Sequence, residues 1–200
     1  MSNLNLSQHY VGGAWVTPLA SERLEVINPA TERSVGAVTL GNAADVDRAV
    51  GAARVAFGEY GSSPLAQRVE LLCSILAVYE KRQQDIALAI TEEMGAPLAT
   101  LSQTAQAATG RGHFATAMEE VRHFPFEDQL RGERIVREPI GVCALITPWN
   151  WPINQIACKV APALAVGCTL VLKPSEIAPL SAHVLAEVLD EAGVPAGVFN

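Results

Sequence analysis

The last third of the sequence constrains the fold most, because it alternates between two kinds of hydrophobic pattern. Continuous apolar runs over 141–146 and 169–172 have the length expected of strands buried on both faces. Helical patterns over 153–166 and 180–192 follow them, and each is ended by a glycine. Strand, helix, strand, helix is a βαβ unit, which almost always has a right-handed crossover and a parallel sheet.

The first 124 residues predict short strands followed by long helices. Strand-like pairs of residues flank Gly12-Gly13-Ala14, which is a hairpin signal, and a second strand is expected over 24–27. Asn42 is a candidate N-cap for the first helix. Helical periodicity is then expected over four segments: 46–57, 64–79, 86–94 and 101–124.

Two further segments differ in character from their surroundings. Residues 125–138 are charged and contain few core residues, so we expect an arm or hairpin outside the main core. Val198-Phe199-Asn200 opens another apolar strand, and a parallel sheet that ended there would leave an exposed edge. We therefore expect this sequence to be a fragment, or the N-terminal part of a longer protein.

Composition excludes several classes of protein. Half of the residues are hydrophobic and 18% are charged, which allows a packed core and excludes wholesale disorder. The net charge of −7 argues against a nucleic-acid or anionic-membrane partner. The longest charge-free stretch, 139–158, contains two prolines within its central loop, so we do not expect it to span a membrane. Four cysteines without a CxxC pair, and no signal peptide, indicate reduced thiols and a cytoplasmic protein.

Two loops follow the predicted parallel strands where ligands usually bind. In open parallel sheets the binding crevice lies beyond the carboxyl ends of the strands. Residues 147–152 follow the first strand and 173–176 follow the second. Neighbouring strand ends lie about 5 Å apart, so we expect both loops to share one ligand in a common cleft.

The polar residues of these loops have both functional and structural interpretations. The carboxylate of Glu176 and the ammonium of Lys173 suit the hydroxyls of a ribose, but they also suit a solvated surface ion pair. Asn150, between two tryptophans and two prolines, is a fixed neutral donor suited to an oxyanion, or a cap for the following helix. Lys159 lies in an apolar helix, where it pairs with a distant carboxylate, bonds to backbone carbonyls or extends its head to solvent.

Other motifs in the sequence carry no chemistry that we can support. Residues 110–115 match the spacing of a dinucleotide-binding glycine motif, but a helical stretch precedes them where a strand is required. The glycine motif is also missing after 141–146, so any dinucleotide must be held in an unusual way. The four histidines lack metal-ligand spacing, and none of the four cysteines has an activating setting.

The strongest motifs resemble those of the NAD(P)-dependent aldehyde dehydrogenase superfamily. They are Glu138-Pro-Ile-Gly-Val, Ile146-Thr-Pro-Trp-Asn-Trp-Pro, Lys159-Val-Ala-Pro-Ala-Leu-Ala and Gly167-Cys-Thr-Leu-Val-Leu-Lys-Pro-Ser-Glu. The likeness extends over nearly the whole chain. It implies an α/β fold: a Rossmann-like parallel sheet that binds coenzyme, with helices on both faces, and a β-hairpin arm used in oligomers. We then expect residues 1–124 and 141–200 to belong to the coenzyme-binding domain, 125–140 to form the arm, and the catalytic domain to be absent.

The resemblance also implies roles for single residues. Asn150 would be the oxyanion-hole donor, and Lys159 would have a charge-relay or structural role. Glu93, with the carbonyls of Val26 and Ile27, falls where some members bind a monovalent cation. The coenzyme contacts would be Ile146, Thr147, Pro148, Trp149, Asn150, Lys173, Ser175 and Glu176, with no catalytic metal.

The implied reaction is oxidation of a small-molecule aldehyde to a carboxylic acid. A cysteine thiolate attacks the aldehyde, hydride passes to NAD or NADP, and a glutamate activates water to release the acid from the thioester. The family's nucleophile and base follow the ribose loop by a long way and are not among these 200 residues. A CoA-acylating dehydrogenase and a non-catalytic coenzyme-binding relative are the alternatives. A homodimer or homotetramer is expected; the identity of the aldehyde does not follow from the sequence.

Overall fold

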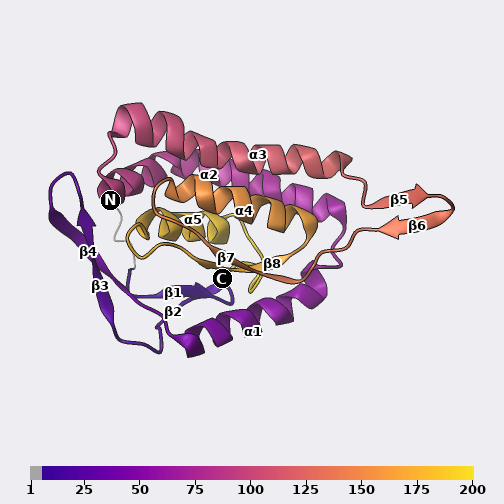
Figure 1. The fold of residues 1–200 in the computed structure, drawn as a ribbon, viewed down its shortest axis with the longest axis horizontal. Coiled ribbons are helices and arrows are strands. Elements are labelled where there is room, and N and C mark those ends of the chain that lie inside the picture. The colour runs from indigo at the N-terminus through magenta and orange to yellow at the C-terminus, as the bar shows by residue number, and fades with distance from the viewer. Residues whose placement is uncertain (1–5) are drawn as a thin grey trace.

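A computed structural model describes residues 6–200, and the expected parallel strands lie between helices in the view of Figure 1. Strand β7 (Val142–Ile146) pairs in parallel with β8 (Thr169–Lys173), with Ile146 opposite Lys173. The backbone at Val198–Asn200 extends this sheet, since the amides of Leu170 and Leu172 donate to the carbonyls of Val198 and Asn200 at 2.9 and 2.8 Å. The predicted βαβ unit and the start of a third parallel strand are both confirmed.

Helix α4 (Pro152–Val166) makes the connection between β7 and β8. Proline at its first position fits a helix start, because the N–H group that proline lacks would have no partner within the helix there. Gly167 ends the helix in the left-handed conformation, at a φ of 92°, which costs glycine little. Helix α1 (Ala43–Tyr60) also packs against both strands, and Figure 1 shows α1 and α4 on opposite sides of them.

The remaining helices build a layer on the α4 side of the strands. These are α2 (Leu65–Met94), α3 (Ala108–His123) and α5 (Leu180–Glu191). The prediction of separate helices over 64–79 and 86–94 is wrong, because α2 is one continuous helix of 30 residues. The intervening residues 80–85 are polar, but they include no glycine or proline to end a helix.

The segment before α3 is a π-helix, η1 (Leu98–Ala107), which leads directly into α3. The sequence predicted helix from residue 101 onward but not this wider winding. Asn42 caps α1 as predicted: its side chain accepts hydrogen bonds from the amides of Ala44 and Asp45, and Asp45 accepts from the Asn42 amide.

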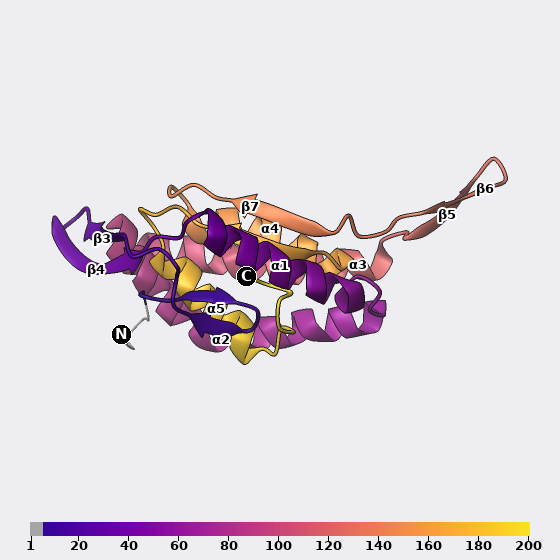
Figure 2. The ribbon, with the colours of Figure 1, turned by 90° about the horizontal axis from the view of Figure 1, so that it is seen from below.

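Within residues 6–200, three antiparallel hairpins lie outside the helical layers. Strands β1 (His9–Val11) and β2 (Ala14–Val16) form the predicted N-terminal hairpin, and β3 (Arg23–Asn28) pairs with β4 (Arg33–Thr39), which the sequence analysis missed. Strands β5 (Glu127–Leu130) and β6 (Glu133–Val136) form the predicted arm, which projects from the body in both views (Figures 1 and 2).

Strand β7 departs from the expectation of burial on both faces. Ala144 and Ile146 are exposed, and the Ile146 side chain keeps 73% of its accessible surface. The reason is topological, because within residues 6–200 β7 pairs only with β8 and so lies at the edge of the sheet. In the described part of the chain, no helix combines the length and apolar character needed to cross a membrane.

Candidate active site

The ends of β7 and β8 bring the two predicted loops together. The Thr147 amide donates to the Lys173 carbonyl at 3.2 Å, which extends the parallel ladder to the last residue of β8. The loop 148–151 and the loop 174–176 therefore start from adjacent points on the sheet. This confirms that the two loops begin at the same edge of the sheet, and the sharing of one ligand by their polar side chains stays a prediction.

The side-chain amide of Asn150 is available to a ligand. Its side chain is exposed and makes no hydrogen bond to any residue among 6–200. The N-cap of α4 is Trp151, and no side chain caps that helix, so the interpretation of Asn150 as a cap is wrong. The flanking prolines Pro148 and Pro152 restrict the backbone on either side of this free amide.

Lys173 and Glu176 form an ion pair at the end of β8. The Lys173 Nζ and Glu176 Oε2 atoms are 2.7 Å apart, and both side chains are exposed. The hydrogen bond from Lys173 lowers the pKa of the Glu176 carboxyl, so this group is an anion at neutral pH. Ser175 is buried between them, where its hydroxyl accepts from the Ile177 amide at 3.3 Å and holds the loop.

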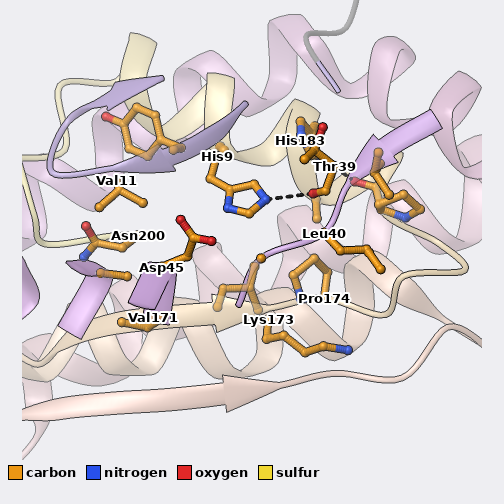
Figure 3. Close-up of a pocket in the computed structure, with 18 of the residues that line it drawn as sticks. His9, Val11, Thr39, Leu40, Asp45, Val171, Lys173, Pro174, His183 and Asn200 are labelled. Carbon is orange, nitrogen blue, oxygen red and sulfur yellow. Dashed lines mark hydrogen bonds between the residues drawn. The ribbon is translucent and has the colours of Figure 1, made fainter. Parts of the chain in front are cut away.

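A cavity of about 470 Å³ lies on one side of the 173–176 loop (Figure 3). Its walls are mostly apolar and come from the β1–β2 hairpin, the start of α1, β8 and α5. His9 Nε2 donates to the Thr39 carbonyl at 2.9 Å, and Asp45 Oδ1 accepts from the Leu19 amide at 2.8 Å. The sequence analysis missed these N-terminal wall residues, because no local motif marks them.

The predicted common cleft differs from this cavity. Lys173 and Glu176 line it, but Ile146, Thr147, Pro148, Trp149 and Asn150 do not. The loops are adjacent in the sheet, but the Asn150 side chain lies outside this cavity. We therefore do not equate the cavity with the shared site expected from the sequence.

The other candidate residues are held by the fold. Lys159 donates to the Gln155 carbonyl at 2.9 Å and to Gln155 Oε1 at 3.3 Å, so the backbone-carbonyl interpretation is the right one. Glu93 is buried, and its carboxylate accepts from the Leu180 amide and the Ser181 hydroxyl, both at 2.5 Å. The cation role that the resemblance implies for Glu93 stays a prediction. Within residues 6–200 no group of histidine, cysteine and acidic side chains has the arrangement of a metal site.

The four cysteines differ in their surroundings, and the Sγ atom of Cys158 lies 3.7 Å from the Lys159 Nζ atom. Burial and the neighbouring Cys168 thiol raise the pKa of Cys143 to about 11, which keeps it protonated. Cys168 is buried and Cys158 is half-buried on α4. Cys73 is exposed, but it lies on α2 beside Met118 of α3, away from the strand ends.

Comparison with known proteins decides the family. The profile of the aldehyde dehydrogenase family matches residues 15–200. The chain belongs to this family. A 3-succinoylsemialdehyde-pyridine dehydrogenase from a Pseudomonas species is 56% identical over 96% of the chain and 40% of that relative. A putative aldehyde dehydrogenase from Staphylococcus aureus is 46% identical over 97% of the chain and 41% of its own length.

Solved structures of the family share the fold. An aldehyde dehydrogenase C mutant from Pseudomonas syringae, in complex with NAD+ and octanal, matches with a TM-score of 0.96 and 44% identity over all of the chain and 41% of its own. An aldehyde dehydrogenase from Bartonella henselae matches with a TM-score of 0.93 and 44% identity, over 96% of the chain and 41% of its own. The Rossmann-like α/β fold class is confirmed, and the chain spans about 40% of the length of these aldehyde dehydrogenases.

Proposed function

We propose that this chain supplies the oxyanion donor and part of the coenzyme site of an NAD(P)-dependent aldehyde dehydrogenase. The observation that carries the proposal is the free amide of Asn150, exposed at the carboxyl end of β7 beside the loop that holds Lys173 and Glu176. This is the edge where parallel sheets bind dinucleotides. The cysteine nucleophile and the glutamate base come from sequence outside these 200 residues.

The residues of this chain act on the charge that develops in the reaction. When a thiolate adds to the aldehyde carbon, the carbonyl oxygen becomes an anion, and the Asn150 Nδ2–H group donates to it. Because Asn150 is neutral and its backbone is restrained, it stabilises the anion without a proton transfer. The bound coenzyme accepts the hydride, and water attacks the resulting thioester to release a carboxylic acid. Lys159, tied to Gln155, has a structural role in α4.

The loop after β8 fits the ribose of a nicotinamide coenzyme. A carboxylate accepts both hydroxyls of a diol, and an ammonium donates to the same oxygens. The lowered pKa of Glu176 keeps the carboxylate charged, and it would repel a 2′-phosphate. Lys173 is already paired with Glu176, which leaves it less available to such a phosphate. We therefore favour NAD over NADP, with Ile146, Thr147, Pro148, Trp149 and Ser175 as further contacts.

The relatives act on or bind different aldehydes, so they indicate the class of the substrate but not its identity. One is named for a pyridine-bearing semialdehyde, and another was solved with octanal. We propose a small-molecule aldehyde, a homodimer or homotetramer and a cytoplasmic location. A CoA-acylating enzyme or a coenzyme-binding relative without activity is the alternative, and the presence of the base glutamate distinguishes the first from our proposal.

Coenzyme binding by residues 1–200 tests the ribose loop. In a calorimetric titration with NAD, Lys173→Ala together with Glu176→Ala should weaken the binding measured for the unchanged chain. The matched control removes another exposed ion pair, Arg134 and Glu127 of the arm, and should leave affinity unchanged. Equal affinity in all three proteins would remove Lys173 and Glu176 from the coenzyme site.

Activity tests the role of Asn150. Residues 1–200 alone should show no NAD-dependent aldehyde oxidation, because the nucleophile and base are missing. In the enzyme that joins this chain to those residues, Asn150→Ala should lower kcat by ~10²–10³-fold, the loss measured for a single oxyanion donor. Unchanged turnover in that variant would contradict the proposal.

A further inference from the structure

Cys158 and Lys159 are neighbours on α4 whose side chains converge on one acceptor. The Cys158 Sγ–H group donates to the Gln155 carbonyl at 3.4 Å, and Lys159 Nζ donates to the same oxygen at 2.9 Å. Lys159 Nζ also lies 3.3 Å from Gln155 Oε1 and 3.7 Å from Cys158 Sγ. The preceding turn of the helix therefore holds the thiol and the amine next to each other.

Both groups are accessible from outside the core. Cys158 and Lys159 are half-buried, whereas Ala157 and Val160 on either side of them are fully buried. In the contacts described for residues 6–200, no other cysteine touches a lysine, since Cys73 contacts a methionine and the two sheet cysteines contact each other. The pair is thus a distinct cluster of two nucleophilic groups that the proposed oxidation does not use.

A thiol beside an amine can pass an acyl group from sulfur to nitrogen. An acyl thioester first exchanges its thiol: Cys158 Sγ bonds to the acyl carbon, the carbon–sulfur bond of the reagent breaks, and the reagent's thiol leaves with the Cys158 proton. The Lys159 ammonium then loses one proton to solvent, and its nitrogen bonds to the acyl carbon. The Cys158 sulfur leaves with a second amine proton, so the products are an amide and a free thiol.

We propose that Lys159 is an acylation site and that Cys158 captures the acyl group for it from small acyl thioesters. Proximity drives the transfer, because a nucleophile held beside its acceptor reacts as if it were at very high concentration. Acylation removes the positive charge of Lys159 and weakens its contacts with Gln155. The proposal goes beyond the proposed function and does not depend on it, because the transfer needs neither coenzyme nor the dehydrogenase nucleophile.

Acetylation of the 200-residue chain by N,S-diacetylcysteamine, a small acetyl thioester, tests the proposal. Peptide mass spectrometry should show that Lys159 is acetylated about tenfold faster than Lys81, or more. Lys81 is a suitable reference, because it is exposed on α2 and lies ~12 Å along the helix from Cys73. Equal rates at the two lysines would overturn the proposal.

Cysteine variants test whether the acyl group passes through Cys158. Cys158→Ser keeps a side chain of similar size but replaces the thiol by a much weaker nucleophile, so acetylation of Lys159 should fall to the rate of Lys81. Cys73→Ser removes an exposed thiol elsewhere and should leave Lys159 unchanged. Circular dichroism establishes that each variant is folded. An undiminished rate at Lys159 in Cys158→Ser would show direct acylation of the amine and rule out capture by Cys158.

Lys159→Arg tests the capture step while Cys158 stays in place. Arginine keeps the positive charge and donors for Gln155 but does not take up the acyl group, so a thioester should accumulate on Cys158. Neutral hydroxylamine should remove that acetyl group, and it should leave the amide on Lys159 of the unchanged chain intact. A Lys159→Arg variant that carries no acetyl group on Cys158 would overturn the proposal, even where Cys158→Ser fails to fold.

Discussion

Glu93 is a buried carboxylate that joins two helices through its hydrogen bonds. It lies near the end of α2, and its oxygens accept from the amide of Leu180 and from the amide and hydroxyl of Ser181, at the start of α5. The carboxylate therefore caps α5, whose preceding residue, Pro179, provides no side-chain cap. Burial nevertheless raises the pKa of Glu93 to about 7, against the hydrogen bonds that lower it.

This raised pKa predicts how stability varies with pH. The folded protein keeps the Glu93 proton between pH 4.5, the ordinary value, and about 7, where the unfolded chain has lost it. The free energy of unfolding should therefore fall as pH rises through that window, by roughly 3 kcal/mol. Glu93→Gln should flatten this dependence in urea denaturation at a series of pH values, and Ser181→Ala, which keeps the carboxylate, should retain it. Parallel pH profiles for wild type and Glu93→Gln would contradict the prediction.

Single residues differ in how far the sequence could predict them. Asn42 was predictable as a cap, because the partners of its side chain are two and three residues away. The capping role of Glu93 was not, because its partners are 87 and 88 residues away in the chain. The loops 147–152 and 173–176 were predictable because each follows an apolar run and has a proline as its second residue.

At the scale of elements, local patterns predicted the βαβ unit and missed the winding of η1. Apolar runs and the glycines after the helices identify β7, α4, β8 and α5 without reference to the rest of the chain. Gln106, within the π-helix, is fully buried where η1 packs against α2, α3 and α4. No periodicity in the sequence separates it from an ordinary α-helix.

The buried side-chain amide of Gln106, in η1, gives a prediction about stability. Within residues 6–200 neither amide atom of this buried side chain has a hydrogen-bond partner, which is a cost to folding. Gln106→Leu keeps a similar volume and removes that cost, so the free energy of unfolding should rise by about 1–3 kcal/mol in urea denaturation. Gln103→Leu, exposed on the same helix, should change it by less than about 0.5 kcal/mol. Destabilisation of Gln106→Leu would show that the amide is hydrogen-bonded in solution.

Arg82 connects α2 to α5 through a cluster of carboxylates. It is hydrogen-bonded to Asp85 and Glu187, each at 2.6 Å, and to Glu191, and its side chain is only 17% exposed. Arg82→Leu leaves these carboxylates close together without a cation, so it should destabilise the fold by about 1–3 kcal/mol. Arg111→Leu breaks an exposed pair with Glu80 and should cost less than about 1 kcal/mol. Equal losses in the two variants, by chemical denaturation, would contradict a special role for the Arg82 cluster.

At the scale of the whole molecule, the arm projects from the body (Figure 1) and its two strands pair with no other strand in residues 6–200. Strands β5 and β6 pair only with each other within residues 6–200, and a lone two-stranded hairpin is marginally stable in water. Leu130 and Val136 are 58% and 49% exposed on it. Apolar side chains on a projecting hairpin favour burial against another subunit, which agrees with the proposed homo-oligomer.

Replacing residues 127–136 by a short Gly-Ser loop in the complete enzyme tests this role. The oligomer measured by light scattering should become smaller, because the hairpin would no longer add apolar surface to an interface. NAD affinity measured on residues 1–200 should be unchanged by the same replacement, because none of these arm residues lines the cavity at the 173–176 loop or pairs with β7 or β8. An unchanged oligomer would assign assembly to another surface, and a lost affinity for NAD would mean that the arm supports the fold of the coenzyme-binding region.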